Sequence, residues 1–127
     1  MKYTDWIAQA NEDLSASEIL LNNGKYFASA YYSQQAVEKI LKALLLHLGK
    51  DPDMNSLTEL VELIENEGVS VPQNIKEDAM ILSPHFIISR YPDAANGVPA
   101  KQYSKSMATD LLKRAKEVIQ WVKEKVQ

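Results

Sequence analysis

The residues best suited to bind a ligand lie in one short segment, Ser89-Arg90-Tyr91-Pro92-Asp93. The fork of an arginine side chain matches the oxygens of a phosphate and stays charged at physiological pH. A tyrosine can stack on a base or donate its hydroxyl, and an aspartate can act as a base or a metal ligand. The segment therefore predicts a phosphate-binding corner at Arg90, with Tyr91 and Asp93 beside it.

Each of these residues also has a purely structural interpretation. Arg90 can cap carbonyl groups or pair with Glu38 or Asp93, because a cation is favoured at a helix C-terminus. Tyr91 can be a half-buried packing residue. Asp93 can be a turn residue that bonds its own backbone, which is the commoner role for a lone carboxylate beside a proline. The surroundings of the segment decide between the two interpretations.

A second polar group lies on the most apolar predicted helix. Gln34, Glu38 and Lys42 follow one another at i, i+4 and i+8 and continue a stripe of apolar side chains. Polar groups in such a stripe need partners if they are buried. We expect Glu38 to pair with Arg90 and to orient it, with Lys42 or Lys39 nearby. The alternative is an ion pair between Glu38 and Lys42 on the helix surface.

Helical periodicity predicts the elements that position these groups, and no segment is a convincing strand. We expect an all-α, up-and-down bundle of four to five helices in a single domain of residues 1–127. Asn55 or Ser56 caps the third helix, and Ser83-Pro84 can restart a short helix that leads to Arg90. The predicted helices run from about Thr4 to Leu21, Lys25 to Leu48, Ser56 to Glu67, Gln73 to Leu82 and Lys101 to Lys125.

The composition excludes several classes of function. The chain has 127 residues, no cysteine and a formal net charge of −3. It therefore has no disulfide and no cysteine-ligated metal, which suits the reducing cytoplasm where we expect it. Its two histidines are far apart and have no acidic motif at ligand spacing, so we expect no metal and no cofactor. The charge argues against broad coating of nucleic acid but leaves room for a local basic pocket.

The apolar runs are short. The longest, from Ala43 to Leu48, is far too short to span a bilayer, so we expect no association with a membrane. The same stretch belongs to a helix that is apolar on two sides, which is typical of a central helix or of one that also packs on a partner.

Several blocks of sequence together resemble one family of small helical proteins. They are Trp6 with Ala10–Leu14, then Gly24–Tyr32, Gln35–Leu44, Leu60–Leu63 and Ser89–Asp93. Their order and spacing resemble the HEPN domain, which is named for higher eukaryotes and prokaryotes nucleotide-binding. The resemblance implies a helical bundle that commonly pairs as a homodimer. The family includes ribonuclease toxins and partner subunits of minimal nucleotidyltransferases.

The chain departs from the ribonuclease branch of that family. That branch carries an arginine followed four to six residues later by a histidine, whereas Tyr91–Asn96 follow Arg90 without one. Thr58 stands where the motif of the third helix often has a histidine. The chain therefore resembles an Arg-Tyr-Pro branch, and the missing histidines favour binding over RNA cleavage.

Three functions remain open at this point. The resemblance implies a nucleotide- or RNA-associated binding subunit, acting with a separate nucleotidyltransferase in a toxin–antitoxin-like system. A second possibility is a divergent ribonuclease in which Asp93, Tyr91 or Asn96 replaces the histidine. A third is a dimerisation module without a ligand. The residues expected at the ligand site are Arg90, Tyr91, Glu38, Lys42, Lys39, Gln34 and Asp93.

Overall fold

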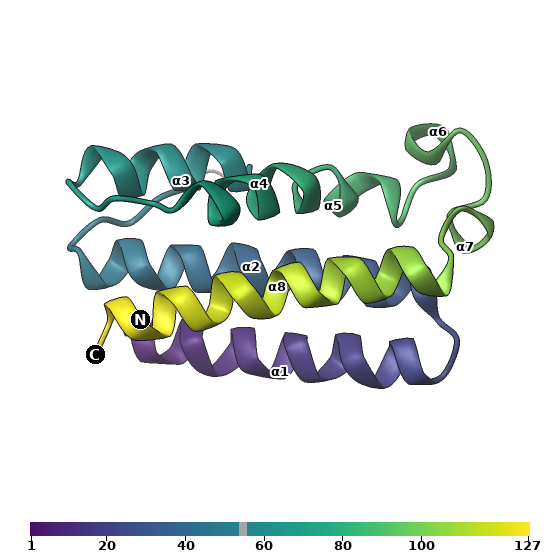
Figure 1. Cartoon of the computed structure of the whole chain (residues 1–127), viewed down its shortest axis with the longest axis horizontal. Helices are drawn as coiled ribbons and strands as arrows, with labels where there is room; N and C mark the ends of the chain where they lie inside the picture. Colours follow the sequence, from purple (N-terminus) through teal and green to yellow (C-terminus); the bar gives the residue numbers. More distant parts are fainter. Residues whose placement is uncertain (54–55) are drawn as a thin grey trace.

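The helices of the computed structural model, which describes residues 1–53 and 56–127, gather around α2 (Figure 1). This central helix, Tyr26–His47, packs against α1, Tyr3–Asn22, on one side and against α8, Lys105–Lys125, on another. The remaining helices are α3, Leu57–Asn66; α4, Gln73–Leu82; and three single turns, α5, His85–Ile88; α6, Pro92–Ala95; and α7, Pro99–Gln102. The prediction of an all-α bundle is confirmed, since the described residues contain no strand.

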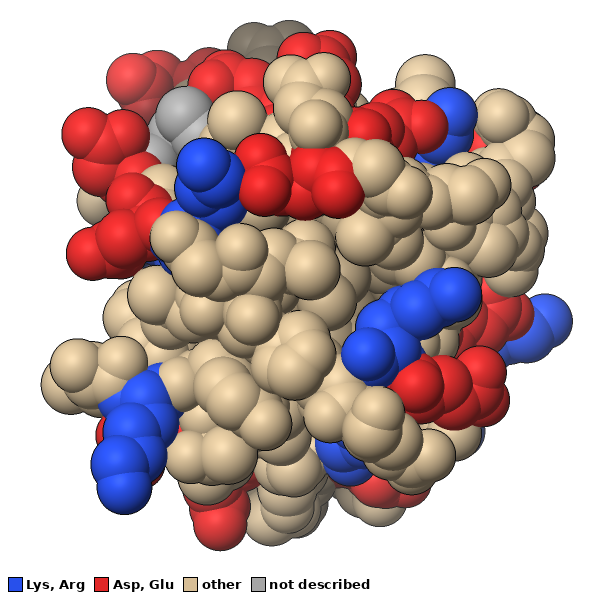
Figure 2. Space-filling view, turned by 90° about the vertical axis from the view of Figure 1, so that its left-hand side faces the viewer, with Lys and Arg blue, Asp and Glu red and all other residues tan. Residues whose placement is uncertain are grey.

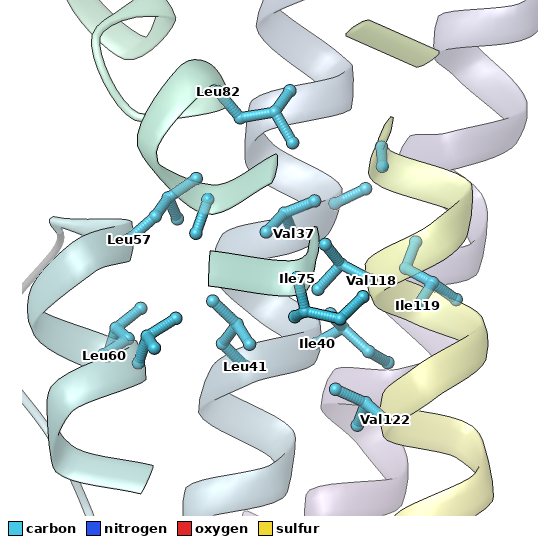
Figure 3. Packing of buried hydrophobic residues seen from close by; sticks show 14 of the residues in the cluster. Val37, Ile40, Leu41, Leu57, Leu60, Ile75, Leu82, Val118, Ile119 and Val122 are labelled. Atoms are coloured by element: carbon cyan, nitrogen blue, oxygen red, sulfur yellow. The ribbon is translucent and has the colours of Figure 1, made fainter. Parts of the chain in front are cut away.

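The core lies where α2 meets the α3–α4 layer and α8. Val37, Ile40 and Leu41 of α2 are fully buried. Figure 3 shows them between Leu57 and Leu60 of α3 on one side and Val118 and Val122 of α8 on the other. Each large aliphatic side chain contributes about 1.5–3 kcal/mol when it is fully buried. The apolar character of α2 on two sides, visible in its sequence, thus reflects its central place.

A cluster of hydroxyl groups joins α1 to α2. The Ser17 Oγ atom donates to the Ser29 carbonyl at 2.8 Å and lies 2.9 Å from the Ser29 Oγ atom. The Ser33 Oγ atom lies 2.8 Å from the same Ser17 hydroxyl. All three serines are fully buried, and their hydrogen bonds satisfy one another. Small side chains here let the two helices approach closely.

The connections determine where the helices end. The Ser83-Pro84 pair separates α4 from α5, so the helix predicted from Gln73 to Leu82 has the expected bounds and a short helix restarts before Arg90. The last helix starts at Lys105 and not at Lys101, because the Ser104 Oγ atom caps it by accepting from the Met107 N–H at 3.1 Å. Ser56 is the N-cap residue of α3, and the alternative cap, Asn55, lies outside the described residues.

The two ends of the bundle differ. Both termini lie at one end, and α6 and α7 lie at the opposite end (Figure 1). Seen from the end with the termini, acidic side chains gather toward α3 (Figure 2). Within residues 1–53 and 56–127, no helix is both long enough and apolar enough to cross a lipid bilayer.

Candidate functional site beside α5

Arg90 follows the single-turn helix α5, and its side chain turns back over that helix. The Arg90 Nε–H group donates to the Phe86 carbonyl at 2.8 Å. This bond satisfies one of the carbonyls left open at a helix end. Arg90 is exposed, and none of the described residues accepts a hydrogen bond from its two terminal nitrogens. One edge of the guanidinium is therefore fixed, while the edge that forms a bidentate pair faces solvent.

Three aromatic rings surround the guanidinium of Arg90. The Arg90 Cζ atom lies 4.4 Å from the centre of the Phe86 ring and 4.8 Å from that of Tyr91. It also lies 5.0 Å from the centre of the Tyr31 ring, which belongs to α2. Cations within about 6 Å of a ring face are attracted to it. The rings thus hold the guanidinium in place. A carboxylate would neutralise its positive charge, whereas the rings do not.

Tyr91 and Asp93 lie on the turn that follows. Tyr91 is extended, with φ −118° and ψ 126°, as expected for a residue before proline. Its ring contacts Arg90, and the side chain is 48% exposed. The Asp93 Oδ1 atom accepts from the Ala94 N–H at 3.0 Å, in the manner of a turn residue. The exposed ring of Tyr91 leaves a surface on which a planar group can stack.

A pocket of about 340 Å³ adjoins Arg90. It lies between α2 and the start of α7, and its wall includes Phe27, Tyr31, Val98 and Pro99. The volume is at the lower end of the range typical of small-ligand sites. Most of this wall is apolar, and Arg90 supplies its positive charge.

His85 and Tyr103 join the single-turn helix that precedes Arg90 to the rest of the bundle. The His85 Nδ1 atom and the Tyr103 hydroxyl share a hydrogen bond of 2.6 Å that ties α5 to the start of α8. Burial lowers the pKa of His85 and raises the pKa of Tyr103 to about 12. Both side chains are therefore neutral at pH 7. Tyr103 gave no signal in the sequence analysis, because a lone tyrosine between two helices has no distinctive spacing.

The predicted pair between Glu38 and Arg90 is wrong. The Glu38 Oε2 atom lies 3.4 Å from Lys42 Nζ, and its Oε1 atom is buried with no hydrogen-bond partner among the described residues. Arg90 stacks on Tyr31, which precedes Glu38 by two turns, or about 10 Å along the helix. Glu38 and Lys42 instead form the alternative pair, although Glu38 is only 9% exposed. Lys42 also lies 5.7 Å above the Trp6 ring.

The other polar residues of α2 point toward α1 or toward each other. Lys39 Nζ lies 2.6 Å from Asp13 Oδ2, which joins α2 to α1, and also donates to Gln35 at 3.2 Å. Gln34 is almost fully buried, and its Oε1 atom accepts from Gln35 Nε2 at 2.8 Å. Lys39 and Gln34 thus have structural partners and do not contact Arg90.

Two residues of the site were missed in the sequence analysis. Phe86 precedes Arg90 by four residues, and this spacing places two side chains on one helix face. Tyr31 lies on α2, and nothing in its local sequence connects it to Arg90. The packing of α5 on α2 brings the two together.

The whole helical arrangement matches a known family. The family model for the HEPN domain matches residues 3–125. The chain belongs to the HEPN domain family. The resemblance read from the sequence is therefore confirmed, and Arg90 of this HEPN domain occupies the end of the bundle where α5, α6 and α7 lie.

Individual relatives agree with this assignment. A protein of Methanocaldococcus jannaschii named "Putative toxin MJ1304" is 31% identical, over 94% of this chain and 84% of that protein. The crystal structure of TT1696 from Thermus thermophilus is 33% identical, with a TM-score of 0.92 over 97% of each chain. The structure of ST0689, an archaeal HEPN homologue, is 29% identical, with a TM-score of 0.86 over 100% of this chain and 99% of that one.

Proposed function

We propose that this HEPN domain binds a phosphate-containing ligand, a nucleotide or a short RNA, through Arg90. The observation that carries the proposal is the guanidinium of Arg90, which is exposed and surrounded by three aromatic rings. A structural arginine usually ends on a carboxylate, whereas this one presents its terminal nitrogens to solvent. Phosphate contacts orient the ligand, and Tyr91 stacks on a base.

The neighbouring residues support a role in binding. The pocket beside Arg90 offers an apolar wall next to a cation, the combination typical of small-ligand sites. Asp93 contributes a negative charge at the edge and remains a candidate contact to a hydroxyl group. Glu38, Lys42, Lys39 and Gln34 are assigned structural roles by their contacts in α1 and α2.

The similarity to a protein named as a toxin supports a further part of the proposal. We propose that the domain is the toxin-like member of a two-protein system and that the other member is a separate minimal nucleotidyltransferase. Its test is co-expression of this chain with a nucleotidyltransferase encoded beside it. The proposal requires the two to co-purify and the partner to relieve any growth defect.

Thermal unfolding with nucleotides and short single-stranded RNAs tests the ligand site. A ligand that binds only the folded state raises its stability, by about 2.7 kcal/mol at a hundredfold excess over Kd. We expect a shift in wild type that disappears in Arg90→Ala and is reduced in Arg90→Lys, which keeps the charge but loses the fork. Lys125→Ala, a distant exposed cation at the end of α8, is the matched control and keeps the shift.

An RNA-cleavage assay and the same unfolding experiment separate the other two functions. RNA cleavage without metal that is lost in Arg90→Ala would indicate the divergent ribonuclease. No shift with any ligand, together with a lower melting temperature of Arg90→Ala, would indicate that Arg90 is a helix cap and that the domain is an interaction module.

A further inference from the structure

A second concave surface lies away from Arg90, between α1, α4 and α8. This groove has a volume of about 770 Å³, more than twice that of the pocket beside Arg90. Its apolar floor includes Leu21 of α1, Ile75 of α4 and Trp121 of α8. It follows α8 from Thr109 to Glu124, four turns or about 22 Å. This length matches a helix of about 15 residues better than a compact small molecule.

One wall of the groove carries a carboxylate without a cation. Glu117 of α8 is half-buried and lines the groove, and no lysine or arginine of the described residues lies within ion-pair distance of it. Two lysines line the same groove: Lys116 pairs with Glu18 at 3.4 Å, and Lys113, four residues before Glu117, is exposed. Glu117 therefore has no direct ion-pair partner among the described residues, and a cation in the groove can pair with it.

Behind Glu117 lies a second, buried carboxyl group. The side chain of Asp78 on α4 is 3% exposed, and its Oδ2 atom has no hydrogen-bond partner among the described side chains and backbone groups. Its Oδ1 atom lies 3.1 Å from Arg114 Nη1, but Arg114 is shared with Asp110, 2.8 Å away. Two carboxyl groups, those of Asp78 and Asp110, thus share one arginine, and Glu117 adjoins Asp78.

The carboxyl groups of this cluster outnumber its one arginine. Burial and the adjacent Glu117 carboxyl raise the pKa of Asp78 to about 7, against the smaller opposing effect of Arg114. Arg114 and Glu117 of α8 are the charged groups that act on Asp78. The other charged pair of α4, between Lys76 and Glu65, ties α4 to α3 and takes no part in it. A second cation near Glu117 would balance the cluster.

We propose that the groove between α1, α4 and α8 binds an amphipathic helix of a partner protein that places an arginine or lysine against Glu117. Apolar side chains of that helix cover Leu21, Ile75 and Trp121, in the common mode of helix-in-groove recognition. The arriving cation also favours the ionised form of Asp78, so binding releases a proton. This proposal does not depend on Arg90.

Synthetic peptides and the fluorescence of Trp121 provide the test. The chain has two tryptophans, so the Trp6→Phe variant has a single tryptophan, Trp121, which lines the groove. The probes are 16-residue helical peptides with leucines at i, i+4, i+7 and i+11. In one series, each peptide carries a single arginine at a different position of the central turn. In the other series, glutamine replaces that arginine. We expect at least one arginine peptide to bind, and its glutamine counterpart to bind about tenfold more weakly.

Two single-charge variants make the result specific. Glu117→Gln should weaken the arginine peptide about tenfold, whereas Glu62→Gln, the same change on the exposed face of α3, should leave it unchanged. Affinity should rise from pH 6 to pH 8, and Asp78→Asn should remove most of that rise. The proposal is overturned if no peptide alters Trp121 emission, if arginine and glutamine peptides bind equally, or if both variants weaken binding alike.

Discussion

The guanidinium of Arg90 is held in one orientation before any ligand arrives. Its Nε–H group donates to a carbonyl of the preceding helix, α5, and Tyr31, Phe86 and Tyr91 contact the guanidinium. A side chain that is already ordered loses less conformational entropy on binding, and this strengthens the complex. The rings therefore contribute to affinity even where they do not touch the ligand.

Replacing one ring tests this role. Tyr31→Leu removes a cation–π contact of about 0.5–1 kcal/mol. We expect the affinity of the phosphate ligand to fall about two- to fivefold. Tyr31→Phe keeps the ring and should match wild type. Titration of both variants with the same nucleotide or RNA measures the effect. Equal affinities of wild type and Tyr31→Leu would show that the ring does not position Arg90.

Asp78 predicts an unusual dependence of stability on pH. Its pKa is about 7 in the folded protein and near 3.8 when unfolded, because burial and Glu117 disfavour the charged form. Between about pH 4 and pH 7 the folded state holds more protons, so the Asp78 contribution to the free energy of unfolding falls as pH rises. His85, whose pKa is lowered by burial, contributes with the opposite sign below its ordinary value of 6.5.

Urea denaturation of wild type and Asp78→Asn isolates this contribution. The stability of wild type relative to Asp78→Asn should fall from pH 5.5 to pH 7 and level off near pH 8. His85 is present in both proteins, so its effect cancels. A difference that does not change with pH would contradict the raised pKa of Asp78.

At the scale of single residues, sequence identified the exposed corner but not its partners. Arg90 was identified by its residue type. The extended backbone of Tyr91 was expected because Tyr91 precedes Pro92. The predicted partner, Glu38, was wrong. The apolar stripe of α2 shows which face of that helix is buried, but it does not show at which position along the helix axis α5 packs. That position depends on the lengths of the connections between residues 48 and 84.

The interface of α1 with α2 depends on a polar contact where an aliphatic one is usual. Ser17 is fully buried and bonds both Ser29 and Ser33. Removing its hydroxyl leaves buried groups on α2 without their partner, at a cost of about 1–2 kcal/mol. We therefore expect Ser17→Ala to lower the free energy of unfolding by that amount in urea denaturation.

Ser15 on the same helix is the matched control. It is exposed, so Ser15→Ala loses no buried hydrogen bond and gains helix propensity. We expect it to be neutral or to stabilise the protein by up to about 0.5 kcal/mol. The prediction fails if the two serine variants are equally stable.

Long helices were easier to predict than short ones. The periodic apolar residues of α1, α2 and α8 determine which face is buried, and these helices were found to within a few residues. The single turns α6 and α7 were not predicted as separate helices, since four residues carry no periodicity. The start of α8 was placed too early because Ser104, which caps it, was not recognised as a cap.

For the whole molecule, we expect a homodimer formed through the end that carries Arg90. Ile87 and Val98 are each about half exposed near that site. Exposed apolar groups gathered in one place are typical of an interaction surface. If a second copy covers them, Ile87→Lys should convert a species of twice the chain mass into monomer.

Analytical ultracentrifugation measures the change. Ile19→Lys places the same charge at an exposed isoleucine of another helix, α1, and should leave the dimer intact. A dimer that survives Ile87→Lys, or a wild-type protein that is monomeric at high concentration, would rule out this surface.

Both termini lie at the end of the bundle opposite α6 and α7 (Figure 1). The helices that run between these ends have 20 to 22 residues, which separates them by about 30 Å. A tag, a fluorophore or a surface attached to either terminus is therefore held away from Arg90. When the protein is immobilised through either terminus, the Arg90 corner faces away from the support, so the attachment itself does not obstruct the site.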